Sequence, residues 1–81
     1  MQKLEMSAAF ATVLKKHRKA KGFSQELLAE RADIHPTHVG LIERSLRNPS
    51  LNVAQAIANA LGLSLTEIVA EAEQIQKKIR K

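Results

Sequence analysis

Apolar residues recur at intervals of three and four along most of this chain, with polar residues between them. This is the spacing of an amphipathic helix, because residues three and four apart lie on the same side of a helix. The pattern therefore predicts an all-α chain of five helices, over residues 8–21, 25–32, 36–44, 51–61 and 65–81. On the fourth, the apolar residues at helical spacing are Leu51, Ala54, Ile57, Ala58 and Leu61.

Residues that suit helix ends stand at most of these boundaries. Ser64 and Glu67 form a capping box at the start of the fifth helix, and Pro36 suits the first position of the third. The other starts have a residue that can cap the first free amides, namely Ser7, Ser24, and either Ser50 or Asn52. The first and fourth helices are each followed by a glycine, Gly22 and Gly62.

The second and third helices are both short and are joined only by Asp33–His35. On the third helix Val39, Ile42 and Glu43 are expected to face inward. Its remaining side chains point outward, and these are Pro36, Thr37, His38, Leu41 and Arg44. Two helices this short with so tight a connection indicate a helix-turn-helix.

Two charged residues lie on stripes that are otherwise apolar. Arg18 is eight residues after Phe10 on the first helix, and Glu43 is on the inner side of the third. A charge that points into a small core needs a partner, so we expect Arg18 to pair with Glu43. The alternative is that the two side chains are solvated independently.

Composition narrows the class of protein. Eighty-one residues make one small domain, whose core self-association would help. Aromatic residues are only 2% of the chain, so Leu, Ile, Val and Ala must fill the core. There is no cysteine, no apolar run long enough for a membrane span, and no signal peptide, which fits a cytoplasmic protein.

The net charge of +5 and the pI near 10.0 favour a polyanionic partner. Four lysines gather towards the end of the first helix: Lys15, Lys16, Lys19 and Lys21. They either form a solvated face that complements the helix dipole or attract the DNA backbone.

The residues of the central pair of helices also carry a family resemblance. Gly22-x-Ser24-Gln25-x-x-Leu28-Ala29, Ile34, Val39, Ile42-Glu43-Arg44 and Pro49-Ser50-Leu51 resemble the Cro/C1-type (XRE) helix-turn-helix domain of phage repressors and bacterial regulators. The region from Ile42 to Asn48 and the chain length are also similar to the controller proteins of restriction–modification systems. The chain has Asp33 and Ser45 where the family often has glycine, and both are plausible left-handed positions.

This resemblance implies a five-helix, lambda-repressor-like fold and a function in binding double-stranded DNA. It covers residues 8–70, which we assign to the helix-turn-helix domain. Residues 1–7 form a lead-in, and residues 71–81 extend the last helix. The resemblance also implies the Arg18–Glu43 pair and a role for Gln25 in holding the DNA backbone.

The third helix would be the recognition helix, whose first turn reaches deepest into the major groove. Thr37 could bond a base or touch a thymine methyl group, and His38 could bond a base or a phosphate. Gly40 would permit close approach. Arg44 and Arg47 could bind guanine or phosphate, and both roles stay open for Arg47. The full predicted DNA-binding set is Gln25, Pro36, Thr37, His38, Leu41, Arg44, Arg47 and Asn48.

Other chemistry finds little support in the sequence. His35 and His38 are three residues apart, but no cysteine or well-placed carboxylate completes a metal site. No Ser, His and acidic residues combine into a nucleophile–base pair. We therefore expect no metal, no cofactor and no enzymatic activity.

A homodimer would double the few base contacts that one domain offers and would match a palindromic operator. Ile75 and Ile79 extend beyond a domain of residues 8–70, so we predict that they form the dimer interface together with spare surface on the fourth helix. Two alternatives stay open: the antitoxin of a toxin–antitoxin pair, and a basic amphipathic module that binds a membrane surface or acts as a scaffold.

Overall fold

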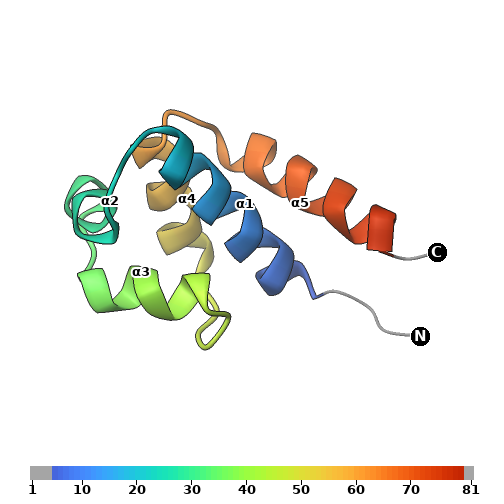
Figure 1. Ribbon diagram of the computed structural model, residues 1–81, viewed down its shortest axis with the longest axis horizontal. Coiled ribbons are helices and arrows are strands. Elements are labelled where there is room, and N and C mark those ends of the chain that lie inside the picture. The colour runs from blue at the N-terminus through green and yellow to red at the C-terminus, as the bar shows by residue number, and fades with distance from the viewer. Residues whose placement is uncertain (1–4, 80–81) are drawn as a thin grey trace.

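The computed structural model describes residues 5–79, with the side chains of residues 5–78. The described chain folds into the five predicted helices (Figure 1). They are α1 (Met6–Ala20), α2 (Gln25–Ala32), α3 (Pro36–Glu43), α4 (Leu51–Ala60) and α5 (Leu65–Ile79). Residues 1–4 of the expected lead-in and residues 80–81 lie outside this description.

The predicted caps are present at α2, α4 and α5. The Ser24 hydroxyl accepts from the Leu27 amide at 3.0 Å, and Ser50 accepts in the same way at the start of α4. Ser64 accepts from the Glu67 amide at 3.0 Å, and the Ser64 amide donates to the Glu67 carboxylate at 2.7 Å. These bonds satisfy amides that have no partner within their own helix.

The prediction that Ser7 caps α1 is wrong. The helix begins at Met6, inside the expected lead-in, and Glu5 occupies the capping position with an extended backbone and no side-chain hydrogen bond to the helix. Ser7 is already within the first turn, where its backbone is helical and its hydroxyl cannot serve as the cap.

Four residues with positive φ turn the chain between helices. Gly22 (φ +73°) and Gly62 (φ +77°) follow α1 and α4, as predicted. Asp33 ends α2 and Ser45 follows α3, each with a φ of 59°. Asp33 and Ser45, which stand where the family often has glycine, therefore both have a left-handed backbone. This backbone conformation favours glycine.

The core lies between α1 and the other helices. α1 packs along α5, while α2 packs against both α3 and α4. Phe10, Val13 and Leu14 of α1 are buried, as are Ile68 and Ala72 of α5. Ile75 is partly buried and packs against this core, so the domain uses more of α5 than residues 8–70.

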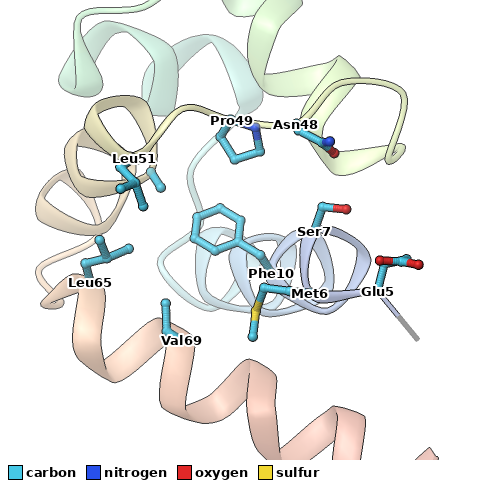
Figure 2. A pocket seen from close by; sticks show the side chains of 10 residues that line it. Glu5, Met6, Ser7, Phe10, Asn48, Pro49, Leu51, Leu65 and Val69 are labelled. Atoms are coloured by element: carbon cyan, nitrogen blue, oxygen red, sulfur yellow. The ribbon is translucent and has the colours of Figure 1, made fainter. Parts of the chain in front are cut away.

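Leu51 does not join the core, although it lies on the apolar repeat of α4. Its side chain is 80% exposed, whereas Ala54, Ile57 and Ala58 are buried. Leu51 is the first residue of α4, and because the Cα–Cβ bonds of a helix tilt towards its N-terminus, this side chain extends beyond the start of the helix. The side chain instead borders a surface groove with Leu65 and Val69 (Figure 2).

Two sets of charged contacts fasten α1 to its neighbours. On one side, Glu71 of α5 pairs with Lys16 and lies 2.8 Å from the His17 ring nitrogen Nε2. On the other, Arg18 Nε is 2.5 Å from Glu43 Oε2, and Arg18 Nη2 is 3.1 Å from Glu43 Oε1. The predicted Arg18–Glu43 pair is confirmed, and both side chains are buried, at 10% and 3% exposed.

We predict that Arg18→Ala lowers the free energy of unfolding by about 3–5 kcal/mol, because it leaves the Glu43 carboxylate buried without its cation. Urea unfolding would measure the loss. Lys19→Ala, an exposed change one position further along α1, should stay within about 0.5 kcal/mol of wild type. Replacing Arg18 and Glu43 together by apolar residues should recover much of the loss. A single Arg18→Ala variant as stable as wild type would contradict the assignment.

Candidate nucleic-acid interface

The helix-turn-helix leaves one side of α3 open to solvent. α2 and α3 pack together across the turn at Asp33–His35, and α3 lies along the lower edge of the molecule in Figure 1. Val39 and Ile42 hold α3 against the core, at 0% and 1% exposed. An eight-residue helix is not stable alone, so this burial determines where its outer side chains stand.

The predicted recognition residues divide by exposure. Pro36, Thr37 and Arg44 are exposed, and Arg47 and Asn48 are exposed in the following loop. Leu41 and His38 are half-buried. The His38 Nε2 atom is enclosed and has no hydrogen-bond partner among the described residues, so this nitrogen does not face the open side of α3.

The start of α3 is held by a residue that the sequence did not identify for this role. The His35 ring nitrogen Nδ1 accepts from the Thr37 amide at 3.1 Å, which makes His35 the cap of α3. Pro36 then occupies the first helical position, where its missing N–H costs nothing. The only available signal was the position of His35 directly before Pro36, because histidine is not among the preferred caps.

Gln25 begins α2, as predicted, but its side chain bridges to α3. Its Nε2 atom donates to Glu43 Oε1 at 2.9 Å, so Glu43 accepts from Arg18 and Gln25 together. A Cβ atom added at Gly40 would lie 3.4 Å from Gln25 Oε1. The absence of a side chain at Gly40 therefore leaves room for the Gln25 side chain, which is half-buried.

Arg44 and Asn48, at and beyond the end of α3, lie in different surroundings. Arg44 folds back, and its Nε donates at 3.2 Å to the Gly40 carbonyl, which also accepts from the Arg44 backbone amide. Asn48 lies beside Pro49 on the rim of the groove that Leu51 borders (Figure 2). The structure thus places Thr37 in the first turn of α3 and Arg44 at its end, whereas Asn48 lies towards a second surface.

Basic side chains gather on the exposed side of α1. Lys15, Lys16 and Lys19 are exposed, and they line a shallow cleft between α1 and Glu43 of α3. Within residues 5–78, no group of three or more His, Asp and Glu residues is placed to hold a metal ion.

No single helix in the described part of the chain is long and apolar enough to cross a membrane. α4 and α5 together are long and apolar enough, but the pair is bent by 101° at the break between the two helices.

Comparison with known proteins gives the same domain. The model of the helix-turn-helix family HTH_3 matches residues 14–68. The control protein C.MunI of a Mycoplasma species is 35% identical over 71 residues, which span 86% of this chain and 96% of that protein. The immunity repressor of Bacillus phage phi105 is 37% identical over 65 residues, but these span only 45% of the repressor.

A solved structure agrees with the sequence relatives. The restriction–modification controller protein C.AhdI from Aeromonas hydrophila superposes with a TM-score of 0.74 at 37% identity, over 76% of this chain and 94% of that one. Its class and that of C.MunI match the controller proteins that the sequence resembled. With its five helices and its exposed α3, this chain belongs to the HTH_3 (XRE-type) family of helix-turn-helix transcription regulators.

Proposed function

We propose that this protein binds double-stranded DNA as a homodimer on a palindromic operator and regulates transcription there. The observation that carries the proposal is the arrangement of α3, which Val39 and Ile42 anchor while Thr37 and Arg44 remain exposed. A helix presented in this way fits the major groove, where each base pair shows its own pattern of donors, acceptors and methyl groups.

The predicted recognition residues each suit a particular contact. The Thr37 hydroxyl has no hydrogen bond within the described residues and can reach a base, while Pro36 and Leu41 can touch thymine methyl groups. Arg44 and Arg47 are free to bind guanine or phosphate through their outer nitrogens. His38 could take part only through the nitrogen that is not enclosed.

A controller of a restriction–modification system is the role that the comparisons favour most. The match to C.MunI covers nearly all of that protein, whereas the phage repressor is more than twice as long as its matched part. The share of each relative that is matched therefore favours the controller role over that of a phage repressor. No observation favours the antitoxin role in the same way.

The surface groove supports the proposed dimer. Leu51 is 80% exposed, and it borders an apolar groove with Met6, Phe10, Leu65 and Val69 (Figure 2). Exposed apolar surface of this kind is typical of interaction sites. We place the centre of the dimer interface here. Ile75 already packs on the core of its own protomer, and the side chain of Ile79 lies outside the described residues.

The proposed function is tested first by DNA binding at increasing salt concentrations. A dimer that neutralises several phosphates in each half should give a log–log slope of about −5 to −10, because counterions are released when it binds. Duplexes selected from a random library should bind more tightly than scrambled ones. Absence of binding to any duplex, or a flat slope, would exclude this function.

Base-reading residues should differ from phosphate-binding ones. Thr37→Ala should reduce the preference for the selected duplex by about 1–3 kcal/mol at particular base pairs, with a small effect on scrambled DNA. Arg47→Ala should do the same if Arg47 reads guanine. An Arg47→Ala variant that weakens both duplexes equally would instead place Arg47 among the phosphate contacts.

The dimer interface can be tested with two exposed leucines. Leu51→Glu should give a folded monomer in sedimentation and weaker operator binding, because burial of one leucine contributes about 1.5–3 kcal/mol. Leu46 is 68% exposed but does not line the groove, so Leu46→Glu is the control and should remain dimeric. If Leu51→Glu also remains dimeric, the interface lies elsewhere on the chain.

A further inference from the structure

The first turn of α3 lies ahead of the residue that anchors this helix in the core. Val39 is the first fully buried residue of α3, whereas Pro36 and Thr37 are exposed and His38 is half-buried. Before the helix, Ile34 packs against the core to which Val39 belongs. Apolar packing therefore fixes the chain on both sides of this turn, but it leaves the turn itself to hydrogen bonds.

His35 supplies the hydrogen bonds for both free amides of the turn. Pro36 has no N–H, so Thr37 and His38 carry the first two amides of α3. The His35 ring nitrogen Nδ1 accepts from the Thr37 amide at 3.1 Å, and the His35 carbonyl accepts from the His38 amide at 2.9 Å. One residue thus holds the backbone of Thr37, whose side chain is exposed on the proposed DNA-binding helix.

α3 has few other features that stabilise its start. It contains eight residues, and its first turn has no acidic side chain to complement the helix dipole. Gly40 lowers the helix propensity of its middle. α2 has the same length, but it has Glu26 in its first turn in addition to the Ser24 cap. The first turn of α3 therefore depends strongly on the bond from His35.

We propose that His35 is a positioning residue for DNA recognition, which acts through Thr37 by holding the first turn of α3. The inference rests on the proposed function, because that function assigns a base contact to Thr37. Such a contact needs the Thr37 hydroxyl at hydrogen-bond distance from one base edge in the major groove. A turn without its cap would spread this hydroxyl over several positions. His35 thus determines how well the protein distinguishes its operator from other DNA.

The His35 ring also has a second nitrogen, and the test must separate its effect from that of the cap. Because Nδ1 accepts a hydrogen bond, the neutral ring carries its hydrogen on Nε2. This N–H belongs to an exposed side chain and is a donor that could contact DNA directly. Serine caps helices through its hydroxyl oxygen but lacks the ring and its outer N–H. His35→Ser therefore keeps the cap and removes the second donor.

The test measures discrimination at the base pair where Thr37→Ala loses its preference. Discrimination is the ratio of the dissociation constants for a duplex substituted at that pair and for the selected duplex. His35→Ala should lower this ratio about fivefold, the factor that a typical helix cap contributes to an equilibrium, and His35→Ser should restore it. In a Thr37→Ala background, His35→Ala should cause no further loss, because the residue through which it acts has been removed.

Ser64→Ala is the matched control, because it removes a side-chain cap from α5 instead of α3. It should keep wild-type discrimination. Equal helix content by circular dichroism at the assay temperature should show that the variants are folded.

The outcomes distinguish this inference from the proposed function. If the wild-type protein binds no duplex, the function fails and the inference fails with it. If wild type binds but Thr37→Ala or His35→Ala keeps full discrimination, the inference is overturned while DNA binding stands. It is also overturned if His35→Ser discriminates as poorly as His35→Ala, which would indicate a direct contact of the ring with DNA. An equal loss from His35→Ala with and without Thr37 would likewise exclude action through Thr37.

Discussion

The buried Glu43 carboxylate is the group on which the arrangement of the DNA-binding helices depends. It accepts from Arg18 of α1 and from Gln25 of α2, while it belongs to α3 itself. Arg18 also donates to the Phe23 carbonyl in the connection between α1 and α2, at 2.8 Å. One carboxylate therefore joins three helices, and burial makes each of these bonds costly to lose because its partner would be left unsatisfied.

This constraint matters because α2 and α3 are short. Eight residues give too few hydrogen bonds to offset the cost of starting a helix, so contacts with the rest of the domain must hold both in place. Apolar packing of Val39 and Ile42 fixes the depth of α3 in the core. The directional bonds to Glu43 fix its orientation, which decides where Thr37 and Arg44 point.

The sequence was sufficient for the elements whose signals are local. The starts of α2, α4 and α5 could be predicted because Ser24, Ser50 and the Ser64–Glu67 box supply side-chain oxygens that cap the first amides. The Arg18–Glu43 pair could be predicted because both charges lie on apolar stripes. α1 begins without any capping side chain, and its start was therefore misplaced.

Other features depend on contacts between helices, which the spacing of apolar residues along the chain does not reveal. The spacing of Leu51 puts it on the stripe of α4, but only the packed helices show that the stripe begins beyond the core. In the same way, Ile75 was expected to be surplus, yet α5 packs far enough along α1 to cover part of it. The bond from Gln25 to Glu43 joins residues 18 positions apart and follows from the crossing of α2 and α3.

α1 separates two surfaces with different chemistry. On one side Lys16 and His17 hold Glu71, which keeps α5 beside α1 and so shapes the apolar groove at Leu65 and Val69. Lys15, Lys16 and Lys19 line a separate cleft that reaches Glu43 of α3. None of these lysines lines the groove, so the apolar surface and the positive charge of α1 occupy different parts of the domain. In the proposed dimer, a second copy would cover the groove without placing these lysines between the protomers, where like charges would oppose association.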